Sequence, residues 1–574
     1  MDDVDAVQAQ IARKMWESGD WVTARLDGVA YLEKAPLVYW AIGAAYGIFG
    51  VHDWAARIPL ALSAIALCWL TSRFGAWALG PQAGFYAGLS LATCVGLFLF
   101  TRILIPDAML TLTVTVALWA FFRALEEDEP RPRRWAFLMA AGLGAGVLLK
   151  GLVAVVLPAG AGLVYLLWRR QLFSARTWRR LYPVSGLLIV LVIALPWHVL
   201  ATLRNPPYFD FTFHAGPGQY RGFFWFYFIN EHLLRFLNLR YPRDYATVPR
   251  LAFWSLHLLW LFPWSVFFPG VLRLDCRPVS RAGRARLLAL CWVGFVLLFF
   301  TFSTTQEYYS MPCYPALALL LASAMASEDA WSRQGTRFLA ALAAASALGI
   351  GLLLYLVRGI PTPGDISLAL TQKPEAYTLS LGHLEDLTFR SFAYLRVPLA
   401  LAGIAFLLGA VGAWRFAGRR ALLAIALMMT LFFHAARVAL LVFDPYLSSR
   451  PLAQALFRAP AGQLIVEGHY YPFSSAFFYA DRSGLLWNGR AVNLEYGSNA
   501  PDAPRVFIGD AELQRLWASS ERHYLVVAGS TVPRLEQLVG RPALIAVAES
   551  GGKFLFTNRP LGSSPRPAGA PRSG

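Results

Sequence analysis

Charged residues are scarce in this chain of 574 residues: they make up 15% of it, against 57% hydrophobic residues. A soluble domain of that composition would expose more hydrocarbon than water tolerates, which excludes a purely soluble fold. Lysine is scarcer still, since only five of the 51 basic residues are lysines. The five cysteines lack CxxC spacing, which indicates buried small hydrophobes rather than metal ligands or a disulfide framework.

Apolar runs long enough to cross a hydrocarbon core as helices, about 20 residues each, occur along most of the chain. They predict about twelve crossings, near residues 53–72, 82–103, 106–124, 135–149, 151–168, 181–201, 251–272, 285–303, 311–328, 338–357, 395–416 and 420–443. The basic stretches lack the aromatic or helical framing that nucleic-acid readers use. The sequence therefore indicates a polytopic α-helical membrane protein without a nucleic-acid partner.

Arginines are concentrated in alternate loops, and the positive-inside rule uses this asymmetry to orient a chain. The loops that carry them are residues 131–134, 169–180, 273–286, 333–337 and 415–420. If these loops face the cytoplasm, the segments that face outward are residues 1–52, 202–250, 358–394 and 444–574. We therefore expect a multi-pass membrane protein whose two ends and C-terminal domain lie outside the cytoplasm.

Two outer segments have the pattern of helices that lie in the membrane interface. Residues 4–16 form one apolar helical stripe, and residues 219–240 mix aromatic side chains with arginines. Both are expected to lie flat on the outer surface.

The composition changes near residue 451, where short alternating segments begin. Strands are predicted at QLIVEG, AFFYA, RVFIGD, HYLVVAG, LIAVAES and KFLFTN, and helices at PLAQALFRA, DAELQRLWASS and VPRLEQLVG. We interpret residues 1–450 as a transmembrane domain and residues 451–560 as a small α/β domain outside the membrane. Residues 561–574, rich in Pro, Gly and Ser, are predicted to be a disordered tail.

Carboxylates gather in two places that this topology puts on the outer side. Asp3 and Asp5 begin the first interfacial segment, and Asp107 follows Pro106 between two apolar spans. Helix capping and a favourable helix dipole explain such positions without any chemistry. The alternative is that both clusters serve one cavity as catalytic carboxylates.

Two further clusters combine charge with aromatic residues at the outer ends of crossings. Glu33 and Lys34 form a charge pair directly before an apolar run, at a depth where charged groups usually serve a site. In NEHLLRF, residues 230–236, Glu231 and Arg235 have the i,i+4 spacing of an ion pair on a helix. The simple alternative is a surface ion pair.

The order of these motifs resembles a known family. SGDW, YLEKAPLVYW, the isolated outer Asp107, LLKGLVAVVLP, LPW, EHLLRF, FPW and the Tyr-x-x-Pro of 309–312 follow one another over residues 1–443. This order is similar to that of polyprenyl-phosphate-dependent glycosyltransferases of the GT-C fold, such as the bacterial aminoarabinose transferases of lipid A, and to protein O-mannosyltransferases. The resemblance implies a protein of the bacterial inner membrane whose active site and C-terminal domain are periplasmic or extracellular. It also implies that a sugar passes there from a polyprenyl-phosphate donor to a lipid or protein acceptor. An in-line displacement assisted by a carboxylate would invert the configuration of the sugar.

The resemblance and the chemistry of such a donor together indicate a phosphate site. Lys34 matches the lysine that holds the lipid phosphate in the family, and Tyr309 matches the tyrosine near that phosphate. Arg235 adds positive charge that stabilises a departing phosphate. We expect these three residues to bind the donor.

Further roles are implied by the resemblance alone. A first-loop carboxylate is the catalytic residue of the family, and in this chain Asp5 or Asp3 takes that place. Glu33 and His232 match residues that can contact a metal, so a divalent metal ion is a candidate cofactor. Asp107 is the third predicted catalytic carboxylate.

The chain departs from the family in two places. TTQEYY stands where the family has a lysine shortly before the Tyr-x-x-Pro motif. The family also has a transmembrane helix before the first loop, and we expect such a helix upstream of Met1.

Two other functions fit the composition. One is a transporter or flippase for a lipid-linked sugar, and the other is a non-catalytic membrane scaffold whose outer domain binds a partner. Transporters place polar groups near the bilayer midplane. Here the polar groups cluster at the predicted outer ends of crossings, which favours the enzyme.

Overall fold

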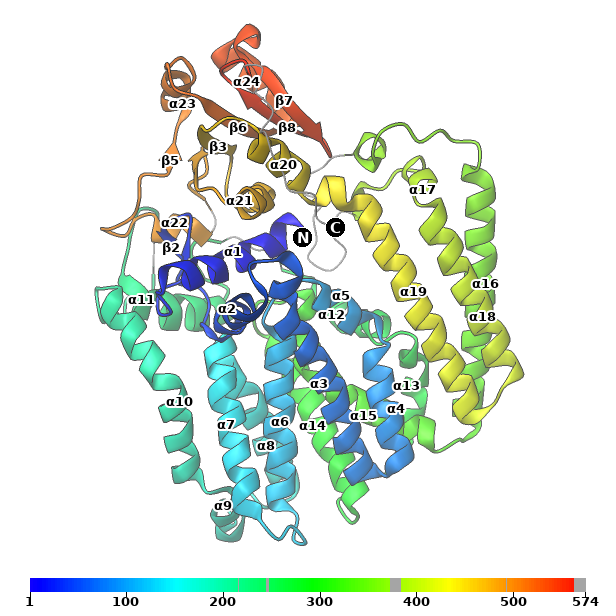
Figure 1. Ribbon diagram of the computed structural model, residues 1–574. Coiled ribbons are helices and arrows are strands. Elements are labelled where there is room, and N and C mark those ends of the chain that lie inside the picture. Colours follow the sequence, from blue (N-terminus) through cyan, green and yellow to red (C-terminus); the bar gives the residue numbers. More distant parts are fainter. Residues whose placement is uncertain (215, 244–246, 372–383, 492, 562–574) are drawn as a thin grey trace.

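A computed structural model of the chain describes residues 1–214, 216–243, 247–371, 384–491 and 493–561. A layer of long helices forms most of the molecule, and one end of this layer carries a small domain built on a sheet (Figure 1). Apart from residue 561, the predicted disordered tail lies outside the described residues.

Among the described residues, eight helical segments are long and apolar enough to cross a membrane. They are α3 (Asp53–Leu79), α6 (Asp107–Leu125), α9 with α10 (Ala175–Leu181, Pro183–Arg204), α14 (Arg281–Thr301), η3 with α15 (Glu307–Cys313, Tyr314–Ala326), α16 (Ala330–Val357), α18 (Arg396–Arg415) and α19 (Gly418–Leu447). The chain is therefore a multi-pass membrane protein.

Two bent helix pairs raise the number of spans to ten if each pair crosses once. They are α4 (Pro81–Ala92) with α5 (Val95–Arg102), and α12 (Arg250–Trp260) with η2 (Trp264–Phe267) and α13 (Phe268–Val271). The other two predicted crossings fold as α7 (Pro132–Lys150) and α8 (Val153–Trp168), which fall short because α8 has 16 residues and α7 has basic ends. Figure 1 shows α7 beside α6 in the same layer. Each of the twelve predicted segments is therefore occupied by helix.

The first predicted interfacial helix is α1 (Asp3–Ser18), but protein covers it on both sides. It packs against α2 (Leu37–Phe49) and against α21 (Ser474–Ala480) of the C-terminal domain, residues 451–560. Val7, Ile11 and Met15 of its apolar stripe are buried. The expectation that this stripe lies on the membrane surface is therefore wrong, because a second domain provides the apolar partner.

The second predicted interfacial segment is a break in the regular helical pattern. It forms the short α11 (Gly222–Phe224) followed by a ten-residue π-helix, η1 (Trp225–Leu234). π-Helical segments are rare and frequently occur at functional sites.

The C-terminal domain is an α/β domain, as predicted. Its sheet has the order β5-β4-β3-β6-β8-β7, in which β5 to β6 are parallel and β8 is antiparallel to both of its neighbours. The strands are β3 (Gln463–Glu467), β4 (Gly484–Trp487), β5 (Phe507–Ile508), β6 (His523–Ala528), β7 (Ile545–Ser550) and β8 (Lys553–Thr557). The helices are α20 (Arg450–Arg458), α21, α22 (Asn493–Gly497), α23 (Asp510–Trp517) and α24 (Val532–Val539).

The segment AFFYA, predicted as a strand, is part of α21 instead, and the strand β4 was not predicted. Apolar runs of five residues do not distinguish a buried helix from a strand. The remaining elements are short: β1 (Arg25–Leu26), β2 (Val29–Ala30), α17 (Ser391–Tyr394), η4 (Ile366–Ala369), η6 (Leu384–Asp386), η7 (Tyr471–Phe473), η8 (Gly529–Thr531) and η9 (Arg541–Ala543).

The hairpin of β1 and β2 docks on the C-terminal domain through a buried carboxyl group. Asp27 occupies the turn in the left-handed region, and its Oδ1 accepts a hydrogen bond from Gly484 N at 3.2 Å. Burial raises the pKa of Asp27 from its ordinary 3.8 to about 6; the bond from Gly484 and the charge of Lys14 offset this only in part. The folded state therefore binds this proton more tightly than the unfolded state does.

We expect Asp27→Asn to raise the melting temperature at pH 7.5. The stabilisation from protonated Asp27 is complete below about pH 4 and is lost as the pH rises through about 6, so ionised Asp27 disfavours folding by up to about 3 kcal/mol. Asparagine tolerates the left-handed turn and still accepts the bond from Gly484. The matched control is Asp502→Asn, which removes an exposed partner of Arg25 on the same hairpin. A lower melting temperature for Asp27→Asn at pH 7.5 would contradict the prediction.

Candidate active site

A cavity of about 400 Å³ lies where the helical layer meets the first loop and η1. Charged and apolar side chains both line the cavity. The apolar side chains in or next to α8, α14 and η1, which we call the apolar wall, are Leu152, Val153, Val156, Leu157, Leu233, Phe236, Phe299 and Phe300. A long hydrocarbon chain and a charged headgroup would thus meet suitable surfaces in the same cavity.

Asp107 is the first residue of α6, and its side chain lines the cavity. Its Oδ1 accepts a hydrogen bond from Lys150 Nζ at 2.6 Å. Lys150 is the last residue of α7, and its ammonium group lies 4.7 Å from the ring centre of Tyr309 and 5.1 Å from that of Tyr308. Helix capping alone therefore does not explain Asp107, because its carboxylate binds a cation of another helix inside the cavity.

Glu33 and Lys34 lie on the loop before α2, and both line the cavity. Lys34 Nζ donates to Glu33 Oε1 at 2.5 Å, and the hydroxyl of Tyr31 donates to Glu33 Oε2 at 3.1 Å. Burial disfavours the charge of Glu33, but the neighbouring Lys34, Arg240 and Arg235 outweigh burial and hold the pKa of Glu33 below its ordinary value. Glu33 is thus an ionised carboxylate at the centre of three cations.

The predicted ion pair between Glu231 and Arg235 is present, but it is part of a larger network. Arg235 Nη1 donates to Glu231 Oε2 at 2.6 Å, and Arg240, which is 3% exposed, donates from Nε to Glu231 Oε1. The guanidinium groups of Arg235 and Arg240 lie 3.8 and 3.9 Å from the oxygens of Glu33. The alternative of a surface ion pair is therefore wrong.

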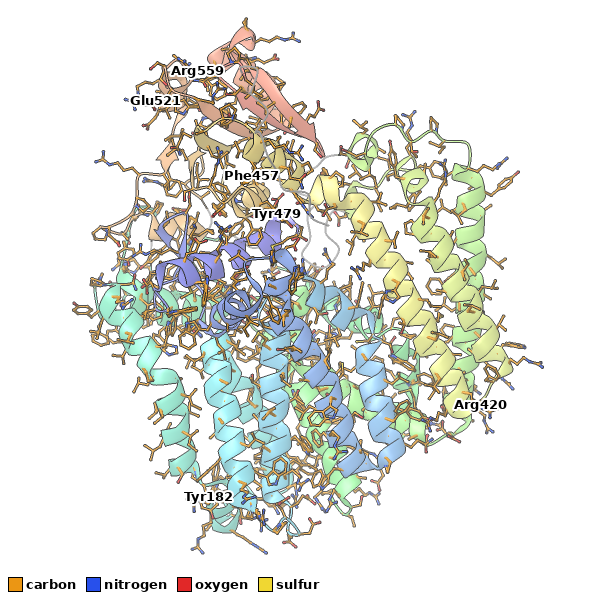
Figure 2. All side chains as sticks on the ribbon, viewed as in Figure 1. Tyr182, Arg420, Phe457, Tyr479, Glu521 and Arg559 are labelled. Atoms are coloured by element: carbon orange, nitrogen blue, oxygen red, sulfur yellow. The ribbon has the colours of Figure 1, made fainter. Side chains whose placement is uncertain are left out.

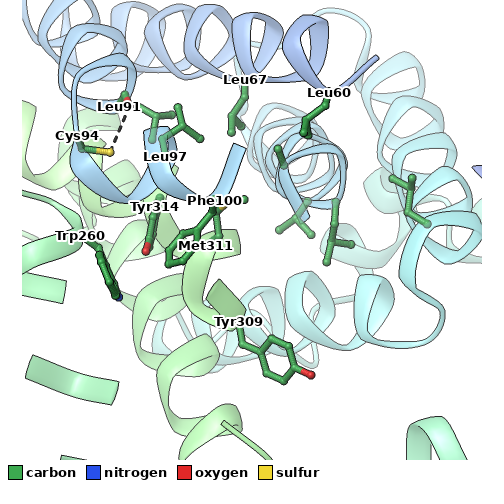
Figure 3. Packing of buried hydrophobic residues seen from close by; sticks show 14 of the residues in the cluster. Leu60, Leu67, Leu91, Cys94, Leu97, Phe100, Trp260, Tyr309, Met311 and Tyr314 are labelled. Atoms are coloured by element: carbon green, nitrogen blue, oxygen red, sulfur yellow. Dashed lines mark hydrogen bonds between the residues drawn. The ribbon is translucent and has the colours of Figure 1, made fainter. Parts of the chain in front are cut away.

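Tyr309 connects this network to the packed helices. Its hydroxyl accepts a hydrogen bond from Arg235 Nη2 at 2.9 Å. Figure 3 shows the hydroxyl pointing away from the packed side chains of Phe100, Met311 and Tyr314. The ring is thus anchored in the core while its polar end faces the charged groups.

We call the charged residues of this region the charged cluster. Its members among the described residues are Glu33, Lys34, Asp107, Lys150, Glu231, Arg235 and Arg240. Four basic side chains face three carboxylates, so the cluster has an excess of one positive charge. An anion such as a phosphate diester would neutralise that excess.

Asp3 and Asp5 do not line the cavity. Asp5 accepts hydrogen bonds from Arg57 and from Leu104 N, neither of which lines the cavity. Asp3 binds the C-terminal domain: its carboxylate accepts from Ser475 N at 2.9 Å and from Lys553 Nζ at 2.6 Å. Burial raises the pKa of both carboxyl groups, and the paired cations oppose this. The catalytic role predicted for either residue stays a prediction.

Glu33 and His232 do not fit a divalent metal ion as they are placed. Leu152 N donates to His232 Nε2 at 3.1 Å, and Nδ1 lies 2.5 Å from Tyr227 O, so both ring nitrogens are engaged. Glu33 is surrounded by three cations, which would repel a fourth. The described residues contain no group of three or more side chains suited to a metal.

Glycine at position 151 lets His232 approach the turn between α7 and α8. Gly151 has φ +67°, and a Cβ atom there would lie 2.0 Å from His232 Nε2. The Lys150–Gly151 pair in LLKGLVAVVLP therefore places Lys150 over the cavity and leaves room for the imidazole.

Lys150 and Arg240 belong to the charged cluster although the sequence did not predict a role for them. A signal that could have pointed to Lys150 is its position, since it is one of five lysines in a chain with 46 arginines and ends an apolar span. Arg240 resembles the other arginines of its loop, and no spacing rule links it to Glu231 nine positions earlier.

Comparisons with known proteins agree with this geometry. Residues 33–199 match the family described as dolichyl-phosphate-mannose-protein mannosyltransferase. The chain is 30% identical over 324 residues to the undecaprenyl phosphate-alpha-4-amino-4-deoxy-L-arabinose arabinosyl transferase of Aeromonas salmonicida, covering 55% of this chain and 54% of the relative. It is 32% identical over 329 residues to a similarly named transferase of Pseudomonas fluorescens, covering 55% and 51%. The alignments thus span about half the length of these curated relatives.

A solved structure extends the likeness to the whole fold. The crystal structure of ArnT from Cupriavidus metallidurans bound to undecaprenyl phosphate superposes with a TM-score of 0.77 at 23% identity, covering 98% of this chain and 95% of that one. At this identity the likeness shows the fold alone. Together these findings confirm the resemblance drawn from the sequence: the chain has the fold of a polyprenyl-phosphate-dependent GT-C glycosyltransferase.

Proposed function

We propose that this protein transfers a sugar from a polyprenyl-phosphate donor to a lipid or protein acceptor at the outer face of the bacterial inner membrane. The observation that supports this most is the charged cluster with its excess positive charge, next to an apolar wall in one cavity. The named activity of the curated relatives and the undecaprenyl phosphate held by ArnT support the same class of donor.

The positions of the side chains support a direct displacement at the sugar. The acceptor oxygen attacks the anomeric carbon of the sugar as the bond from that carbon to the phosphate oxygen breaks, which inverts the configuration. Lys34, Arg235 and Tyr309 stabilise the charge of the departing polyprenyl phosphate. Asp107 takes the proton of the acceptor. Of the three predicted catalytic aspartates, we favour Asp107 because its side chain lines the cavity.

The arginine distribution supports the orientation. Gln8 of α1 lines the cavity, and α1 packs against α21 of the C-terminal domain. The cavity is therefore on the side of the helical layer that carries this domain. Figure 2 shows Tyr182 and Arg420, next to arginine-rich loops, at the opposite end from Glu521 and Arg559 of that domain. By the positive-inside rule the end with Arg420 faces the cytoplasm and the cavity faces outward.

Sealed membrane vesicles test the reaction and its orientation together. A radiolabelled polyprenyl-phosphate sugar and lipid A are supplied from outside to right-side-out and to inverted vesicles. We expect labelled acceptor only with right-side-out vesicles that contain the protein. Labelled donor that crosses the membrane without transfer would support the transporter instead.

A further inference from the structure

The C-terminal domain turns the carboxyl ends of its parallel strands toward the active site. This edge is where α/β domains ordinarily bind their ligands. Tyr471, which follows β3, contacts Tyr31. Glu495 and Tyr496, which follow β4, form hydrogen bonds with Tyr241 and Gly222 on the two sides of η1. At one point the backbones nearly touch, because a Cβ atom on Gly497 would lie 2.0 Å from Ala30 O. The edge of the sheet at which such a domain would ordinarily bind a ligand is thus occupied by the loops that hold the charged cluster.

A chain of hydrogen bonds runs from this edge to Glu33. The hydroxyl oxygens of Tyr31 and Tyr471 are 3.2 Å apart. Tyr31 has a single hydroxyl proton, and it donates that proton to Glu33 Oε2 at 3.1 Å. Tyr471 must therefore be the donor to Tyr31. Such a chain polarises each of its members, so the first hydroxyl influences the last acceptor.

Glu33 is the member of the charged cluster that these bonds orient. Its other oxygen accepts from Lys34, and the guanidinium groups of Arg235 and Arg240 face the same carboxylate. A shift of the carboxylate would therefore move three cations together.

A second contact secures the same cluster from the same edge. The hydroxyl of Tyr241 donates to Glu495 Oε1 at 2.5 Å, directly beside Arg240 in the chain. Asn230 of η1 also holds the backbone of Tyr241, with bonds of 2.6 and 3.0 Å. Residues of the C-terminal domain thus support both Glu33, through Tyr31, and Arg240, through Tyr241.

We propose that Tyr471 is a positioning residue for the donor phosphate site: through Tyr31 it fixes the carboxylate of Glu33, and thereby the cations that hold the phosphate. This inference rests on the proposed function, since it assigns the phosphate to the charged cluster. The C-terminal domain would thus affect donor binding without contacting the donor.

The test measures the affinity for undecaprenyl phosphate, which requires no transfer. Tyr471→Phe keeps the ring and removes the donor hydroxyl, so we expect its Kd to rise about fivefold, the factor for one neutral hydrogen bond. Tyr31→Phe is expected to weaken binding more. The double variant should bind like Tyr31→Phe alone, because Tyr471 acts through Tyr31. A merely structural role would not produce this pattern.

The matched control is Tyr524→Phe. Tyr524 is buried in the same domain, and its hydroxyl donates to Pro460 O at 2.7 Å, away from the charged cluster. We expect its Kd to equal that of the unchanged protein. If Tyr471→Phe also binds normally, or if the double variant is a further fivefold weaker than Tyr31→Phe, the positioning role is overturned and the proposed function stands. If the unchanged protein does not bind undecaprenyl phosphate, both are overturned.

Discussion

Asp107→Asn is expected to lower sugar transfer by about 100-fold or more, while the yield and the melting temperature stay near those of the unchanged protein. Asparagine keeps the size of the side chain, and its amide oxygen still accepts a hydrogen bond from Lys150. It loses the basicity that removes a proton from the acceptor. The measurement is the initial rate of transfer per folded molecule, with saturating polyprenyl-phosphate sugar.

The other end of the same helix offers a matched control. Glu126 follows α6, is 3% exposed, and accepts a hydrogen bond from Arg284 Nε at 2.8 Å. Glu126→Gln removes a buried ion pair in the same way as Asp107→Asn does, but far from the cavity. We expect it to keep its rate per folded molecule. If Asp107→Asn loses activity only as far as Glu126→Gln does, the mechanism fails and the transporter becomes the better interpretation.

Lys34→Ala is expected to raise the KM for the lipid donor by roughly 10- to 100-fold, the range for loss of a hydrogen bond to a charged group. Removing Lys34 leaves Glu33 with two arginines, so the carboxylate stays paired and the fold is expected to persist. The measurement is the transfer rate as a function of donor concentration.

Lys14→Ala serves as the control for this change. Lys14 lies on α1, pairs with Glu17 at 2.8 Å and is outside the cavity. Its removal should leave the KM unchanged. An equally unchanged KM for Lys34→Ala would mean that Lys34 is a solvated lysine whose stem lies along apolar surface.

The transmembrane helices could be predicted because hydrocarbon thickness sets the length of each apolar run. The C-terminal strands were harder, since AFFYA and GLLW are too short for periodicity to decide between helix and strand. The sequence also could not show that α1 lies between two protein surfaces. Its apolar stripe is the same whether lipid or α21 covers it.

The residues of the candidate site also divide into those that sequence motifs predict and those that they do not. Glu33, Lys34, Asp107, His232, Arg235 and Tyr309 were selected from motifs, and the structure brings all six to one cavity. Asp3 and Asp5 are predicted only because the resemblance implies a catalytic carboxylate in the first loop, and the partners that hold them lie far along the chain. The partnership of Asp107 with Lys150 spans 43 positions, and no spacing rule reveals it.

The link between α1 and the C-terminal domain has a consequence for synthesis. Asp3 is translated hundreds of residues before Ser449, Ser475 and Lys553, which bind its carboxylate. Until β8 leaves the ribosome, the nascent chain holds this carboxylate without its cation. The first loop therefore acquires its final seating only after β8 has been made, and a ribosome that stalls before Lys553 leaves the helices inserted but the loop beside the cavity unanchored.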